Sequence, residues 1–206
     1  MSATTGRGPY AKSAEVRRRI LEACVDAFGE TGFHGATMKD IAKRAGISHT
    51  GLLHHFARKE DLLIAVLELC AERSVDFLKS TDAIDPAEHP VEALRGMLAV
   101  IVGSELQPGI MELNAVLSGE ATSPEHPAHM YFGQRYRSVR HFYTDAFTAL
   151  AARGELRSTL TPEALATTTL ALINGLQVQW LFDRDSIKVE SAIRDFLVSL
   201  VPGLDR

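Results

Sequence analysis

Side chains that can hydrogen-bond to nucleic acid are concentrated between residues 37 and 59. Ser48, His49 and Thr50 are consecutive, and their hydroxyl and imidazole groups can donate to or accept from the edges of bases. Thr37 and Lys59 each stand at the expected start of a helix, where unpaired backbone N–H groups and the positive end of the helix dipole favour phosphate. These residue types predict the binding of a polyanion.

The histidines could instead ligate a metal ion. His54 is followed directly by His55, and His126 and His129 are three residues apart. Neither pair is accompanied by the spaced further ligands that complete a tetrahedral zinc site. The two cysteines are isolated from each other, which is typical of small buried core residues. We therefore expect no metal and no other cofactor.

The elements that must position these side chains are helices. Apolar residues recur at helical spacing along nearly the whole chain, without a sustained two-residue alternation flanked by hairpin turns. The predicted fold class is all-α, with an N-terminal three-helix helix-turn-helix domain, a larger C-terminal helical bundle and about nine helices in all. The expected helices cover approximately residues 13–31, 37–45, 48–56, 59–79, 91–102, 110–121, 123–153, 161–183 and 189–201.

Capping residues mark the ends of the first three helices. Gly32 and Gly46 are placed to end the first and second helices in the left-handed conformation that glycine adopts without strain. Thr37 is followed three residues later by Asp40, which predicts a capping box, and Ser48 is placed to cap the third helix. Two short capped helices joined by a glycine turn have the dimensions of a DNA-binding helix-turn-helix, although an ordinary helical hairpin would look similar.

Charge is distributed unevenly along the chain. Residues 1–60 hold ten Lys and Arg against six Asp and Glu, whereas the rest holds 12 against 20, within a net charge of −4. A basic DNA-binding head on an acidic body explains this asymmetry, and so do chance and solvated helix faces. A protein that binds DNA without sequence preference would be expected to be basic throughout.

The segment TMKDIAKRAGISHTGLLHHFARKEDLL, residues 37–63, resembles the signature of the TetR family. In that signature a T-x-x-x-I-A-x-x-A-G-V-S stretch leads into L-Y-x-H-F and a K-x-x-L start of the fourth helix. Leu53 stands where the family usually has a tyrosine that reaches a phosphate, so we do not expect this contact. The resemblance implies a DNA-binding helix-turn-helix domain over residues 1–58 and a ligand-sensing and dimerisation domain over residues 59–206.

The resemblance also implies which residues contact DNA. The first turn of the recognition helix would meet base edges, Thr37 and Lys59 would clamp phosphates, and a basic N-terminal arm would follow the minor groove. The predicted DNA-binding residues are Arg7, Lys12, Thr37, Met38, Lys39, Ser48, His49, Thr50, Gly51, His54, His55 and Lys59.

Two further sites are implied in the C-terminal part. Bases are read in half-sites, so a homodimer that spaces two heads about 34 Å apart, or a multiple of it, is expected. The family pairs through its last two helices, represented here by Leu165, Leu172, Leu176, Trp180, Ile193, Phe196, Leu197 and Leu200. The family's ligand pocket lies among helices four to eight. The residues predicted to line it here are Phe77, Met97, Ile101, Met111, Asn114, Leu117, Tyr136, Phe142, Asn174 and Gln177. Each could also be ordinary core, but the methionines and aromatic side chains favour a small apolar or amphipathic effector.

The function expected from the resemblance is transcriptional repression, with release from a palindromic operator by a small molecule. An activator of the same fold is the alternative, because a helix-turn-helix does not set the sign of regulation. An all-helical enzyme is a further alternative, but no GxSxG, P-loop, HExxH or dinucleotide-binding motif occurs, and no enzyme activity is expected. No apolar run approaches the roughly 18 residues of a membrane span, and no signal sequence begins the chain, so we expect a cytoplasmic protein without membrane association.

Overall fold

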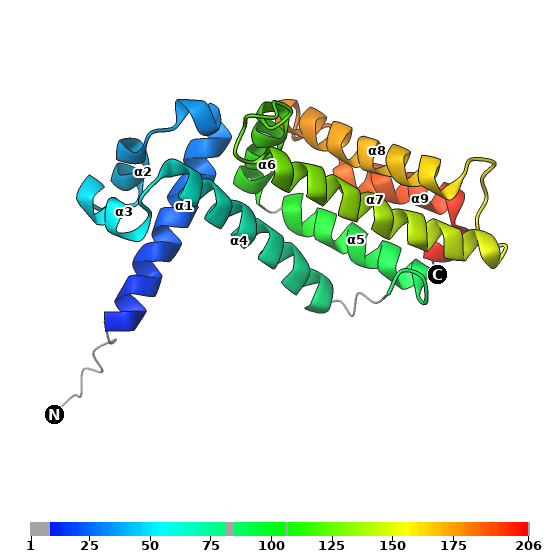
Figure 1. Ribbon diagram of the computed structural model, residues 1–206. Coiled ribbons are helices and arrows are strands. Elements are labelled where there is room, and N and C mark those ends of the chain that lie inside the picture. Colours follow the sequence, from blue (N-terminus) through cyan, green and yellow to red (C-terminus); the bar gives the residue numbers. More distant parts are fainter. Residues whose placement is uncertain (1–8, 81–84, 106, 206) are drawn as a thin grey trace.

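The computed structural model describes residues 9–80, 85–105 and 107–205, which form a small helical head beside a larger helical bundle (Figure 1). Within this described part the chain forms nine α-helices, a terminal 3₁₀ turn and no strand, so the predicted all-α class is confirmed. We call residues 9–58 the head and residues 59–205 the body. The elements are α1 (Pro9–Gly35), α2 (Met38–Arg44), α3 (His49–His55), α4 (Lys59–Ser80), α5 (Pro90–Glu105), α6 (Pro108–Glu120), α7 (His129–Ala152), α8 (Pro162–Phe182), α9 (Val189–Leu200) and η1 (Pro202–Asp205).

The helix ends of the head follow the predicted caps. Gly32 leaves the helical region at φ 71° and ψ 178°, as predicted, although helical structure resumes after it and extends α1 to Gly35. Thr37 Oγ1 accepts from the backbone N–H of Asp40 at 3.1 Å, and Ser48 Oγ accepts from that of Gly51 at 3.0 Å. The capping box at α2 is only half formed, because the Asp40 carboxylate accepts instead from the side chain of Arg44, one turn further on.

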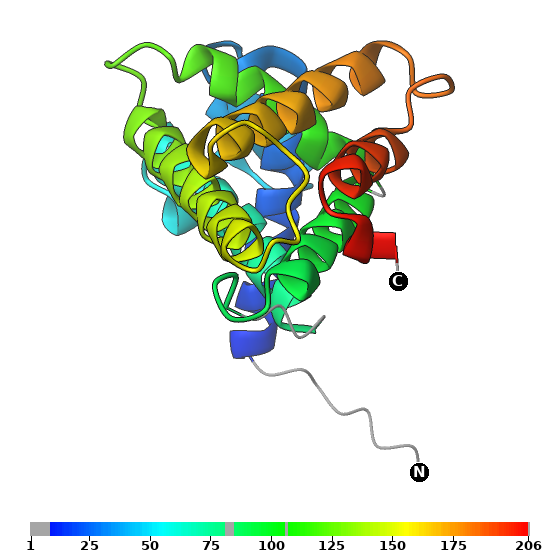
Figure 2. The same cartoon turned by 90° about the vertical axis from the view of Figure 1, so that its right-hand side faces the viewer.

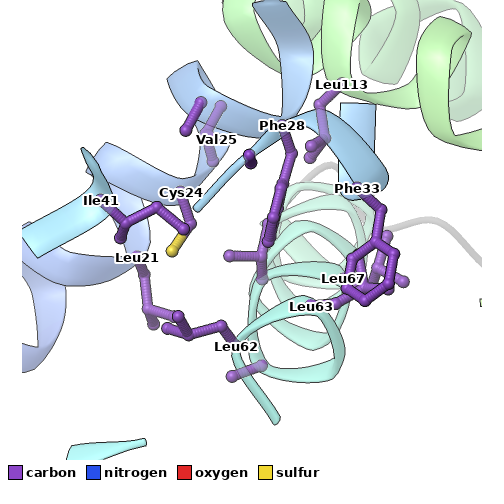
Figure 3. Packing of buried hydrophobic residues seen from close by; sticks show 14 of the residues in the cluster. Leu21, Cys24, Val25, Phe28, Phe33, Ile41, Leu62, Leu63, Leu67 and Leu113 are labelled. Atoms are coloured by element: carbon purple, nitrogen blue, oxygen red, sulfur yellow. The ribbon is translucent and has the colours of Figure 1, made fainter. Parts of the chain in front are cut away.

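One buried cluster joins the head to α4 and α6. Phe28 of α1 is fully buried and lies among side chains of α4 and Leu113 of α6 (Figure 3). Cys24 belongs to the same cluster, and burial raises the pKa of its thiol to about 12. Leu117 is also fully buried in this cluster and is not among the residues that line the cavity described below, which argues against its predicted place in the ligand pocket.

A second buried cluster fills the bundle of α5, α7, α8 and α9, which Figure 2 shows from the side of the body. Leu165, Ile193 and Leu197 are at most 1% exposed there, and Trp180 is 9% exposed. Because these four side chains are buried within one chain, little of their surface is left for a partner, which argues against their predicted place in the dimer interface. The apolar stripe of α9 packs against α5 and α8 of its own chain. No helix in the described ranges is long and apolar enough to cross a membrane.

Candidate functional site

The exposed face of α3 carries the predicted base-contacting side chains. The helix α3 lies on the side of the head away from the body (Figure 1). His49, Thr50 and His54 are exposed on it, while Leu52 is fully buried and anchors the helix to the core of the head. Leu53 shares the outer face and is 41% exposed, so an apolar side chain lies among polar ones. It can offer DNA only apolar contact, such as packing on a thymine methyl group or a sugar.

A shallow groove of about 500 Å³ lies between α2 and α3. Thr37, Lys39, Lys43 and His49 are among its lining residues, so residues predicted separately are brought together on one surface. Lys43 was not predicted, although it follows Lys39 by one helical turn, a spacing that places two cations on the same face. Both ammonium groups can reach phosphate from this edge of the helix-turn-helix.

Other predicted contacts are partly withdrawn from this surface. Met38 is half-buried against the core of the head, which argues against its predicted contact with DNA. Gly51 and His55 are half-buried on α3. Ser48 is exposed, but its hydroxyl oxygen is engaged in capping α3, so the hydroxyl hydrogen is the group it can offer to a base or phosphate.

Lys59 has a structural partner that the sequence did not indicate. Its Nζ donates to the backbone carbonyls of Phe33, at 2.7 Å, and Ala36, at 2.9 Å. The same ammonium group lies 4.5 Å from the centre of the Phe33 ring. The ammonium therefore ties the start of α4 to the end of α1, and this geometry argues against the predicted phosphate clamp.

Several head arginines are neutralised by nearby carboxylates. Arg44 forms ion pairs with Glu30 at 2.7 Å and with Asp40 at 2.8 Å, and its hydrogen bonds hold the pKa of Glu30 below the usual value. Arg18 is paired with acidic residues one turn before and after it in α1. Lys39, Lys43 and Arg19 are exposed and form no ion pair within the described part of the chain. Arg7 and the side chain of Lys12, also predicted to contact DNA, lie outside the described residues.

The head is fastened to the body at the end of α6. Glu120, the last residue of α6, accepts a 2.8 Å hydrogen bond from the backbone N–H of Phe33 through Oε2. Its other carboxylate oxygen lies so close to Gly32 that a Cβ there would come within 2.1 Å of it. Further along the contact, a Cβ on Gly29 would come within 3.3 Å of both Glu112 and Leu113. α1 and α6 are therefore packed nearly backbone to backbone.

His126 and His129 belong to this junction. His126 is buried, its Nδ1 accepts from the backbone N–H of Ala128 at 3.1 Å, and its Nε2 lies 3.6 Å from Glu120 Oε2. Burial lowers the pKa of His126, while the carboxylate opposes that shift. His129 Nδ1 lies 2.8 Å from the carbonyl of Ala121. Among the described residues no group of three or more His, Cys, Asp or Glu side chains could hold a metal ion.

A cavity of about 130 Å³ lies between helices α4 to α8. Seven of the predicted pocket residues line it: Met97, Ile101, Met111, Asn114, Tyr136, Asn174 and Gln177. Phe142 does not line it but packs on the body core, and the side chain of Phe77 lies outside the described residues. Arg135 lines it and was not predicted, although it lies three residues after Phe132 and four before Val139, which line it too. That helical spacing was the available signal.

An exposed apolar stripe runs along α8. Ala171, Gly175, Val178 and Phe182 follow at intervals of three or four residues and are all exposed, with Val178 at 43% and Phe182 at 87%. The stripe stands beside the predicted interface residues Leu172 and Leu176, which are half-buried, as are Phe196 and Leu200 of α9. A partner packed on this face of α8 would remove apolar area from water.

The fold and the head together define a helix-turn-helix protein with a larger helical body. The comparisons with known proteins agree. Residues 20–66 match the model of bacterial regulatory proteins of the tetR family, and residues 90–202 match the C-terminal domain of BetI-type transcriptional repressors. The chain belongs to the TetR family of bacterial transcriptional regulators.

Individual relatives match different parts of the chain. The HTH-type transcriptional regulator RutR of Escherichia coli is 48% identical over 64 residues, which are 31% of this chain and only 30% of RutR. The regulator TtgR of Pseudomonas putida is 26% identical over 180 residues, covering 85% of each chain. A solved TetR-family regulator from Agrobacterium tumefaciens superposes with a TM-score of 0.72 at 21% identity, over 92% of this chain and 98% of that one.

Proposed function

We propose that the chain is a homodimeric repressor that binds a palindromic operator and is released by a small molecule entering the cavity between α4 and α8. The observation that carries the proposal is the double role of α6. Five of its residues, Ile110, Met111, Asn114, Ala115 and Ser118, line the cavity, and its last residue, Glu120, holds the end of α1. A ligand that displaces α6 must therefore change the contact that orients the head.

The match of residues 90–202 to BetI-type repressors supports the repressor over the activator. One small head makes too few contacts for tight specific DNA binding, so a second copy is expected. The exposed apolar stripe on α8 supports pairing with that copy. Linkage then requires that the effector favour the spacing of the heads that does not fit the operator. The effector must bind that state more tightly by the same factor by which it weakens DNA binding. The corresponding coupling free energy is typically about 1–3 kcal/mol.

The test begins with selection of bound sequences from a random DNA pool at a stated salt concentration. A palindrome with half-sites about one helical turn apart, or a multiple of it, is the expected product. Thr50→Ala should relax the base preference at the contacted position, because it removes the hydroxyl of an exposed residue on the outer face of α3. Recovery of a non-palindromic site, or of no site, would contradict the proposal.

Pairing through α8 is tested on the same operator. Phe182→Glu places a charge in the exposed apolar stripe and should convert the dimer to a monomer in light scattering, with loss of palindromic binding. Met130→Glu is the matched control, because Met130 is also an exposed apolar residue, at 73%, but lies on α7. A Phe182→Glu protein that stays dimeric would refute this interface.

A further inference from the structure

The cavity is lined by a cation that no described lining residue balances. Arg135 is the only charged side chain among the 18 described residues that line it. Within the described part of the chain, Arg135 forms no ion pair with a carboxylate. The neutral phenol of Tyr131 lies near it and donates to the carbonyl of Leu67 at 3.1 Å. Arg135 is half-buried, so part of this side chain is withdrawn from water. A cation in such a place is stabilised by an anion that supplies the missing charge.

Other lining residues offer neutral polar groups. Asn174 and Gln177 of α8 line the cavity, and neither side chain forms a hydrogen bond within the described part. Asn114 of α6 donates to the carbonyl of Ile110 at 3.0 Å, which leaves its amide oxygen as an acceptor. These amides can bind a second polar group of a ligand, but they supply no charge.

Most of the remaining lining is apolar, with the hydroxyl groups of Ser118 and Tyr136 as further neutral polar groups, and the space is small. Met97, Ile101, Met111, Phe132 and Ile173 are among the side chains that surround the cavity. Its volume of about 130 Å³ is close to that of engineered apolar cavities, roughly 150 Å³, which accept benzene. An apolar body of about one ring therefore fits this space.

We propose that the effector is a small organic acid, an aromatic or short-chain carboxylate whose anionic group pairs with Arg135. The inference rests on the proposed role of the cavity as the effector site, and it adds the charge and size of the ligand. A guanidinium binds a carboxylate through two parallel N–H donors, so both the charge and the planar geometry are used. A cationic ligand of the same size is excluded by the same arginine.

The test measures binding to the free dimer by calorimetry. The probes are benzoate, phenylacetate and hexanoate, with benzamide as the neutral counterpart and benzylamine as the cationic one. At least one carboxylate should bind about tenfold more tightly than benzamide, since a hydrogen bond to a charged group contributes more than one between neutral groups. Arg135→Gln should abolish that preference and Arg135→Lys should restore part of it. Arg137→Gln, at an exposed arginine on the same helix, is the matched control and should leave the preference intact.

Each outcome decides the proposal. It is overturned if no carboxylate binds, if benzamide or benzylamine binds as tightly, or if Arg135→Gln keeps the preference while thermal melting shows that it folds. Operator binding is measured separately. A carboxylate that binds through Arg135 without weakening operator affinity upholds the anion site and refutes effector release. Release of the operator by a neutral compound upholds effector release and refutes the anionic effector.

Discussion

Gly32→Ala should destabilise the protein by more than a typical substitution of a left-handed glycine. At φ 71° and ψ 178° the backbone lies in a region used almost only by glycine, and alanine there costs about 2 kcal/mol. The added Cβ would also lie 2.1 Å from Glu120 Oε1, so the carboxylate must move and its 2.8 Å hydrogen bond to Phe33 is lost. The Glu120 side chain is 26% exposed, so water replaces part of that bond and its loss costs about 1–2 kcal/mol. The expected total is about 3–4 kcal/mol.

Two comparisons separate these contributions in urea unfolding followed by circular dichroism. Gly154→Ala is the matched control, because Gly154 has φ 69° and nothing within 4 Å of its added Cβ, so it should cost only about 1–2 kcal/mol. In a Glu120→Ala background, Gly32→Ala should lose its extra cost, and the difference between backgrounds gives the share of Glu120. The reasoning is refuted if Gly32→Ala costs no more than Gly154→Ala, or if its cost is the same in both backgrounds.

Two further predictions concern the same end of the head. Lys59→Met should lower the free energy of unfolding by about 2 kcal/mol, because two charge-assisted bonds to backbone carbonyls are lost. Lys59→Met should leave the salt dependence of operator binding unchanged. Lys43→Met should instead reduce the slope of log affinity against log salt concentration by about one unit per head, with little loss of stability. A reduced slope for Lys59→Met would show that Lys59 does contact phosphate. His126 has a lowered pKa in the folded protein because burial disfavours its charged form, so the unfolded chain takes up the proton first. Stability should therefore be constant above the ordinary value of 6.5 and fall as the pH drops from there towards the folded pKa. His126→Asn keeps an acceptor for the Ala128 N–H and should flatten this part of the pH profile; an equal slope in both proteins would assign it to other groups.

Some of the junction between head and body was visible in the sequence, and some was not. Gly32 was identified as a helix end from its place after an apolar periodic segment, and its positive φ bears this out. Its partner Glu120 lies 87 residues from Phe33, and no local pattern links the two. The partners of Lys59 are likewise backbone carbonyls, 23 and 26 residues away, which a sequence motif cannot indicate.

The sequence by itself determined the helices, their caps and the family, because each depends on residues within one or two turns of each other. The helix-turn-helix signature and the exposed face of α3 belong to this group. Only the tertiary structure decided which helix covers each apolar face. Leu117 lies in the core shared with the head, Leu165 and Ile193 lie inside the body, and Arg135 faces a cavity. Helical periodicity indicates that one face of a helix is buried. The packing of helices distant in sequence determines whether that face meets the core, a partner subunit or a ligand.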